Sequence, residues 1–189
     1  DHNGSYDVFL AKYQDKDIVP VRGKQCASEQ LPSINKKFPT FRSFADAKIN
    51  DLLIENSNSG IKLETKLFSS VLFLRNQNVF ELQKLPVAAQ FAPIESILVE
   101  DLNQDGLKEI LVAGNQMNSE IETTRADAGI GILLAQTEDK KWYTIPAHKS
   151  GISLPFDVKD VKKINVQGRI HLLVASNADT LRIFDLGTH

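Results

Sequence analysis

Cysteine, long apolar runs and an excess of basic charge are all scarce in this sequence of 189 residues. The one cysteine, Cys26, excludes an internal disulfide framework. The longest apolar run, near 130–135, has the length of a strand and falls far short of the roughly 20 residues that cross a bilayer. The formal net charge is −2, and the basic stripe of a nucleic-acid-binding protein is absent. We therefore expect a protein that neither spans a membrane nor binds nucleic acid.

A methionine and a signal-peptide pattern are also absent from the start, which reads Asp1-His2-Asn3. We interpret the sequence as that of a mature or truncated product. Hydrophobic residues make up 42% of it, which at this length is enough for one sizeable core or two small ones.

A repeated pattern appears when the sequence is aligned on itself. In the best-preserved copy, at 103–115, a polar turn with a glycine leads to an acidic residue and then to an apolar run that ends in alanine. Residues 1–13 align with this copy without a gap. A degenerate third copy, at 160–177, keeps the glycine, the apolar run and the Ala-x-Asn ending, but its turn has lost the acidic residues. Three copies indicate a repeat protein.

The spacing of the copies reveals an extra segment. Gly4 and Gly106 are 102 positions apart, whereas Gly106 and Gly168 are 62 apart. The excess matches the region 21–54, where apolar residues follow helical spacing. These residues are Phe41, Phe44, Ala45, Ile49, Leu52 and Leu53. We expect Thr40 to be the N-cap of this helix, and we expect Phe38, Phe41 and Phe44 to form a core stripe.

The remaining sequence reads as short strands separated by polar and Gly-containing turns. The expected strands are 66–74, 79–85, 94–99, 109–113, 129–136, 141–145, 158–164, 170–175 and 181–184. A repeat of about 60 residues with four short strands has the size of a β-propeller blade. We predict an all-β fold in which 1–189 forms a partial propeller of about three blade units, with a small α-helical insertion at 21–54. Since three blades cannot close a ring, the chain should belong to a larger propeller or complete one with another polypeptide.

Residues 101–109 have the composition of a calcium-binding loop. Oxygen-bearing side chains occupy loop positions 1, 3, 5 and 9, at Asp101, Asn103, Asp105 and Glu109. Ca²⁺ takes six to eight hard oxygen ligands, and short side chains on alternate residues can all point at one ion. Gly106 permits a sharp turn that lets a backbone carbonyl, that of Leu107, supply a further ligand.

Two other interpretations compete with this one. An EF-hand shares the first six loop positions, but it needs a glutamate at position 12, where Val112 stands, and a helix where 110–113 reads as a strand. An Asp/Asn/Gly turn without an ion is the second alternative, because these residues favour turns in any case.

The loop pattern D-x-[DN]-x-[DN]-G-x-x-[DE], followed by a hydrophobic strand, resembles the FG-GAP repeat of integrin-type propellers and of bacterial VCBS-repeat proteins. Runs such as Pro20-Val21-Arg22-Gly23 and Phe38-Pro39-Thr40 are similar to the C-terminal region of large VCBS-repeat proteins of Gram-negative bacteria. The resemblance implies an exported protein that binds Ca²⁺ in blade-edge loops and serves adhesion, glycan handling or complex assembly without catalysis. Glu109 departs from the commoner aspartate at its position.

The alignment also places the start of the sequence inside a second calcium loop. Asp1 falls at position 3, Asn3 at position 5, Ser5 at the carbonyl position and Asp7 at position 9. Position 1 would precede the sequence. We expect this second site to bind an ion weakly and the polypeptide to have been cut from something longer, while the acid-free third copy should be structural.

Other candidate motifs carry less information. The four histidines show no metal-ligand spacing, and Gly129-Ile130-Gly131 lacks the third glycine of a dinucleotide fingerprint, so we expect a strand with close backbone packing there. No serine or cysteine stands in a nucleophile pattern. The polar stretch 116–127 is either a ligand-binding loop or a solvated connection.

The leading hypothesis is a non-enzymatic, calcium-binding β-propeller segment of a surface or secreted protein, located outside a Gram-negative cell or at its outer membrane. Its partner would be a protein, a glycan or the rest of a larger propeller. The alternative is a fragment of a propeller-type polysaccharide lyase or glycosidase, although no carboxylate pair stands out. A third hypothesis is an assembly subunit that docks through 21–54.

Overall fold

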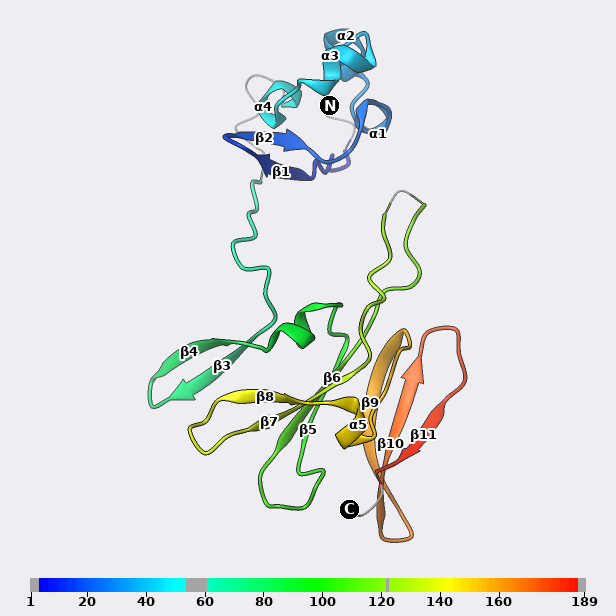
Figure 1. Ribbon diagram of the computed structural model, residues 1–189. Coiled ribbons are helices and arrows are strands. Elements are labelled where there is room, and N and C mark those ends of the chain that lie inside the picture. Colours follow the sequence, from blue (N-terminus) through cyan, green and yellow to red (C-terminus); the bar gives the residue numbers. More distant parts are fainter. Residues whose placement is uncertain (1–3, 54–60, 122, 187–189) are drawn as a thin grey trace. The chain divides into compact units, whose positions relative to one another are not determined.

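The structure is a computed structural model that describes residues 4–53, 61–121 and 123–186. The chain divides into two compact units, Asp1–Glu64 and Thr65–His189, which are blue to cyan and green to red in Figure 1. The strands form several small antiparallel sheets, so the fold is mostly β, as predicted. No helix in the described part of the chain is long and apolar enough to cross a membrane.

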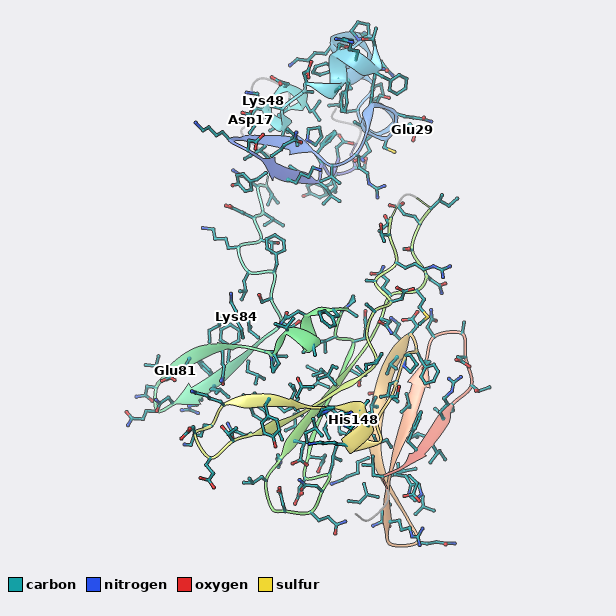
Figure 2. The ribbon with its side chains drawn as sticks, viewed as in Figure 1. Asp17, Glu29, Lys48, Glu81, Lys84 and His148 are labelled. Atoms are coloured by element: carbon teal, nitrogen blue, oxygen red, sulfur yellow. The ribbon has the colours of Figure 1, made fainter. Side chains whose placement is uncertain are left out.

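The first unit combines one hairpin with four short helices. The hairpin pairs β1 (Ala11–Gln14) with β2 (Asp17–Pro20), and the helices are α1 (Lys24–Gln30), α2 (Ser33–Lys37), α3 (Phe41–Ala45) and α4 (Ile49–Leu52). All four helices lie within 21–54, where helical structure was expected. Figure 2 shows Asp17 of β2 beside Lys48, and their side chains form an ion pair of 2.8 Å that ties the hairpin to the start of α4.

The helices enclose a small core of their own. Its buried members are Ala27, Leu31, Ile34, Phe44, Ala47 and Leu52. Thr40 is the N-cap of α3, as predicted, and its Oγ1 accepts a hydrogen bond of 3.1 Å from the Ser43 N–H. The expected core stripe of three phenylalanines is wrong at Phe41, whose side chain is 71% exposed. Phe41 is the first residue of α3, and its ring lies outside the core, beneath the Lys24 ammonium.

The first repeat copy does not form the strand expected after Asp7. Residues 6–10 lie outside any strand, and β1 begins only at Ala11. Phe9 packs against the helical core, while its neighbours Val8 and Leu10 remain exposed. In this copy, one apolar residue packs against the helices, and the apolar run forms no strand over 6–10.

The second unit contains three sheets (Figure 1). A hairpin joins β3 (Val71–Asn76) and β4 (Val79–Lys84), and the 3₁₀ helix η1 (Val87–Gln90) follows it. A four-stranded sheet comprises β5 (Ser96–Glu100), β6 (Glu109–Ala113), β7 (Ile132–Gln136) and β8 (Trp142–Ile145), paired in sequence order. The short helix α5 (Ala147–Ser150) leads to a three-stranded sheet of β9 (Val158–Val166), β10 (Arg169–Ser176) and β11 (Arg182–Asp185).

The four-stranded sheet is covered on both faces. Leu111 and Ala113 of β6 belong to a core shared with β9 and β10, whereas Ile110 and Val112 belong to another with Leu85 and Ala89. The half-buried Trp142 packs against the second core, as does Leu72 of β3. Burial on both faces explains why 110–113 of β6 reads as an unbroken apolar run.

The strands β5 and β9 bring the two larger sheets side by side. The Val161 N–H donates a hydrogen bond of 2.9 Å to Ser96 Oγ. Further along the same strands, Lys163 forms an ion pair with Glu100, and this contact lowers the pKa of Glu100. The first strands of the two sheets, β5 and β9, are therefore neighbours.

Most expected strands of the second unit are observed with small shifts at their ends. The strand expected at 66–74 is wrong over 66–70, since β3 begins at Val71. The strand expected at 129–136 is wrong over its first three residues, since β7 begins at Ile132. Gly131 has a φ of 72° and would place a Cβ 3.0 Å from Leu154 Cβ. Close backbone packing at this glycine is as predicted, but the positive φ delays the strand to Ile132.

Candidate calcium loop and its surroundings

The candidate calcium loop connects β5 to β6 and occupies 101–108. The strands pair up to Glu100↔Glu109, so the loop begins and ends at a fixed separation. Two residues have positive φ, Gln104 at 62° and Gly106 at 88°. No atom lies within 4 Å of a Cβ built on Gly106, so a glycine is favoured there by backbone conformation and not by space.

Side-chain oxygens of the loop accept hydrogen bonds from its own backbone. Asn103 Oδ1 accepts from the Asp105 N–H at 2.9 Å, and Asp105 Oδ1 accepts from the Leu107 N–H at 2.7 Å. Asp101 Oδ2 accepts from the Gly106 N–H at 3.0 Å. These are the turns that Asp and Asn form without an ion, and each carboxylate keeps lone pairs for another partner.

Glu109 and one oxygen of Asp101 are shielded from water. Glu109 is 2% exposed, and its Oε2 accepts a hydrogen bond of 2.9 Å from the Leu102 N–H. Asp101 Oδ1 is buried and has no hydrogen-bond partner. A buried carboxylate oxygen without a partner is costly unless a cation offsets it. The unpartnered atom thus lies at loop position 1, where the sequence predicts a calcium ligand.

The residues present fit Ca²⁺ in chemistry, because the predicted set consists of hard oxygen donors and includes an unpartnered buried carboxylate oxygen. The side chains are not gathered into a closed cluster: within the described ranges, no three His, Cys, Asp or Glu side chains lie close enough to hold a metal ion.

The second predicted loop lies partly beyond the described residues. Asp1 and Asn3 fall outside them, while Ser5 is exposed and Asp7 half-buried in the irregular segment before β1. The ligand set of this loop stays a prediction.

The third copy is a tight hairpin turn between β9 and β10. Gln167 and Gly168 both have positive φ, 52° and 81°, as a two-residue hairpin turn requires. Asn165 Oδ1 accepts a hydrogen bond of 2.8 Å from the Gly168 N–H, and neither turn residue is acidic. This geometry is that of a structural turn.

The asparagine that ends the Ala-x-Asn pattern has a role that the sequence did not reveal. Asn115 is fully buried, its Nδ2 donates to the carbonyls of Gly129 and Phe156, both at 2.9 Å, and its Oδ1 accepts from the Gly129 N–H. It joins the end of β6 to the segments that enter β7 and β9. Asn177, at the same place in the third copy, donates to Asp157 through its N–H and its side chain.

Asp157 is a second buried residue that sequence reasoning missed. Its side chain is 6% exposed and forms an ion pair of 2.9 Å with Lys159. Hydrogen bonding to Lys159 lowers the pKa of Asp157, and bonds from Asn177 and the Met117 backbone act in the same direction. Only the recurrence of Asn after the apolar runs of the second and third copies hinted at this network.

The polar stretch 116–127, which is either a ligand-binding loop or a solvated connection, extends from the sheet between β6 and β7 (Figure 1). Backbone hydrogen bonds between Gln116 and Ala126 close its base, at 2.8 and 3.1 Å. Near its end, Thr123 donates to Glu120 through both its N–H and its hydroxyl. Ile121, within this turn, is fully exposed. Whether 116–127 binds a ligand or is a solvated connection stays a prediction.

A cavity of about 400 Å³ adjoins the candidate calcium loop. Its apolar lining comes from Leu102, Leu133, Ile145, Ile152 and Leu186, and its polar lining from Asn103, Gln104, Glu109, Lys149 and Ser150. The volume is within the range of small-ligand sites. Because Asn103 and Glu109 line it, the cavity and the loop share one wall.

Comparison with known proteins adds no relative: no family model, no curated protein and no solved structure matches the chain. The resemblance to FG-GAP and VCBS repeats therefore remains a prediction that depends on the residue pattern of the loop.

Proposed function

We propose that this chain is a calcium-binding β-propeller segment of a protein displayed on, or secreted from, a bacterial cell, and that it binds a protein or a glycan without catalysis. The observation that carries the proposal is the loop 101–109, where oxygen donors stand at alternate positions and the buried Asp101 Oδ1 has no partner. An ion at this place supplies the missing positive charge.

The sheet arrangement supports the propeller part of the proposal. A blade is a four-stranded antiparallel sheet whose strands pair in sequence order, and β5, β6, β7 and β8 pair in that order. The strands β9 to β11 follow the first three strands of the same path, and β3 and β4 form a two-stranded sheet. The loop that would hold the ion lies between the first two strands of the complete sheet.

The role proposed for the ion is structural. Glu109 and the Oδ1 atom of Asp101 are shielded from water and belong to the same short loop. With Ca²⁺ bound between them and Asp105, their mutual repulsion is replaced by attraction to the ion, and the start of β6 is held in place. The side chains of Asp101, Asn103, Asp105 and Glu109 and the carbonyl of Leu107 are the proposed ligands.

Thermal unfolding with and without calcium tests this proposal. A ligand that binds only the folded state, at 100 times its dissociation constant, stabilises it by about 2.7 kcal/mol. We expect excess Ca²⁺ to raise the Tm by on the order of 10 °C over the value in EDTA. Asp101→Asn and Asp105→Asn should abolish this rise, while Asp160→Asn, which lies outside the loop, should keep it. An unchanged Tm in calcium would contradict a bound ion.

Binding without turnover is tested separately. The chain is passed over immobilised acidic and neutral polysaccharides in calcium, and the same polysaccharides are incubated with it in solution. Retention on a column without a change in polymer length supports a binding module. Shortened polymer would instead favour a lyase or glycosidase.

A further inference from the structure

The cavity of about 400 Å³ in the second unit has an apolar wall that core residues form. Leu133 of β7 and Ile152 are buried members of the core shared by the two larger sheets, and Ile145 of β8 packs against it. Because packing holds these side chains in place, the wall exists before any ligand arrives. The volume is near the lower end of the range for small-ligand sites, so the cavity suits a small ligand with an aliphatic part.

Glu109 brings a negative charge to the lining of this cavity. The residue is buried, and the Leu102 N–H donates to one of its two oxygens, Oε2. In the described part of the chain, no Lys, Arg or His side chain forms an ion pair with it. A buried carboxylate is costly unless a cation or further donors offset it. Since an ionised carboxylate has about four acceptor positions, Glu109 can accept from a ligand in the cavity while it keeps its bond to Leu102.

Lys149 brings a positive charge to the same lining. It belongs to α5, the helix on which Figure 2 labels His148, and it lines the cavity beside Ser150. The Ile152 N–H donates to Ser150 Oγ at 3.2 Å, which ties the end of α5 to the apolar wall. Among the residues that the structure describes, no carboxylate pairs with the Lys149 ammonium. The ammonium is therefore available to an anionic group of a ligand.

The two charges restrict the chemistry of the ligand. A purely anionic ligand would be attracted by Lys149 and repelled by Glu109, and a purely cationic ligand would meet the reverse. A ligand with both an ammonium and a carboxylate group can pair with each residue through charge-assisted hydrogen bonds. Asn103, Gln104 and Ser150 add neutral polar groups to the lining. The cavity thus combines partners for two opposite charges with an aliphatic wall.

We infer that this cavity is a binding site for a small zwitterion of the α-amino-acid class with an aliphatic side chain. Glu109 accepts hydrogen bonds from the ammonium group of the ligand, and Lys149 donates to its carboxylate. Leu133, Ile145 and Ile152 contact its aliphatic side chain. The inference goes beyond the calcium-binding function proposed above and does not rest on it.

Leucine is a direct probe, because it has both charged groups and a branched aliphatic side chain. It is titrated into the ¹⁵N-labelled full chain in EDTA. We expect saturable chemical-shift changes at the amides of Glu109, Ser150 and Ile152, which surround the cavity. Absence of saturable changes, or changes only at residues away from the cavity, overturns the inference.

Three matched compounds test each part of the ligand separately. Leucinamide lacks the carboxylate, 4-methylpentanoate lacks the ammonium, and serine lacks the aliphatic side chain. Each should bind about tenfold more weakly than leucine or worse, since each loses a charge-assisted hydrogen bond or the burial of a leucine side chain. Equal binding of leucine and 4-methylpentanoate, or of leucine and leucinamide, would show that the charged group is not recognised and would overturn the inference.

Variants assign the two charges. Lys149→Met should weaken the binding of leucine but not that of leucinamide, and Glu109→Gln should weaken leucine but not 4-methylpentanoate, because each variant removes the partner of one group. The matched control is Lys141→Met, an exposed lysine outside the lining, which should leave leucine binding unchanged. If the variants fail to fold, the comparison of the four compounds on the unaltered chain decides.

The calcium proposal is tested on the same samples, by thermal unfolding in calcium and in EDTA. Leucine binding without a calcium effect on the Tm supports the cavity site and contradicts the ion in the loop. A calcium effect on the Tm without leucine binding overturns the inference and leaves the proposed function standing.

Discussion

At the scale of single residues, the chain places buried polar groups where its repeat copies join. Asn115 links three segments through hydrogen bonds, and Asp157 links Lys159, Asn177 and the backbone of Met117. Since a buried polar group without its partner costs about 1–3 kcal/mol, these residues fix how the sheets meet. Their bonded partners lie up to 41 positions away in the sequence, and a search for local motifs does not reveal them.

The Asp157 network predicts a pH dependence of stability. The pKa of Asp157 is lowered from 3.8 in the folded state, so its contribution is present above pH 3.8 and is lost as the pH falls through the lowered value. We expect Asp157→Asn to reduce the free energy of unfolding by about 1–3 kcal/mol at pH 6, and this difference should shrink at pH 3. Urea denaturation at both values measures it.

The control for this prediction is Asp160→Asn. Asp160 pairs with Lys162 at 3.2 Å, but both side chains are at least half exposed, and exposed ion pairs contribute little. This variant should match the unaltered chain at both pH values. An Asp157→Asn difference that is equal at pH 6 and pH 3 would show that the residue acts through packing and not through its charge.

At the scale of elements, the end of β6 is the most constrained point of the second unit. A Cβ added at Gly114 would lie 2.2 Å from the Pro93 carbonyl oxygen and 2.6 Å from the Glu95 nitrogen, both backbone atoms. Neither can move without displacing the start of β5. The glycine that follows the apolar run is therefore required for the chain to pass between two segments.

We expect Gly114→Ala to lower the free energy of unfolding by about 2–4 kcal/mol, because the clash forces backbone shifts within a buried strand pair. Gly23→Ala is the matched control, since no atom lies within 4 Å of its added Cβ and its φ is −68°. Thermal unfolding followed by circular dichroism compares the two. A Gly114→Ala protein as stable as the control would contradict the close approach.

The elements differ in how well their sequence predicted them. The strand 109–113 was predicted to the residue, because burial on both faces makes 110–113 of β6 a continuous apolar run. The hairpin of β1 and β2 was missed: every residue of β1 is exposed, and its sequence, Ala-Lys-Tyr-Gln, has no apolar alternation. The helices α1 and α2 are only seven and five residues long, too short to show a periodicity.

The candidate site was predictable in composition and not in geometry. The spacing of Asp101, Asn103 and Asp105 identified the loop and its turn, and both are present. That Asp101 keeps an unpartnered oxygen while Asp105 is engaged with the Leu107 N–H depends on side-chain torsions, which a residue pattern does not specify. The cavity is lined both by loop residues and by Leu186, which are far apart in the sequence and become neighbours only in the fold.

At the scale of the whole molecule, the chain has two units with separate cores. We expect 65–189, produced alone, to fold, because its sheets cover each other with their own apolar residues. The measurement is ¹⁵N NMR: dispersed amide signals that coincide with a subset of those from the full chain support an independent unit. A collapsed spectrum for 65–189, with a dispersed one for the full chain, would contradict it.

The position of Trp142 gives the molecule a built-in spectroscopic reporter. It is the one tryptophan in the sequence, and it packs beside the core that Leu72 and Leu85 share with β6. Its indole N–H is shielded from water, without a hydrogen-bond partner in the structure. Emission at short wavelength is thus expected while the β3–β4 hairpin packs on the four-stranded sheet, and a red shift would report exposure of this core to water.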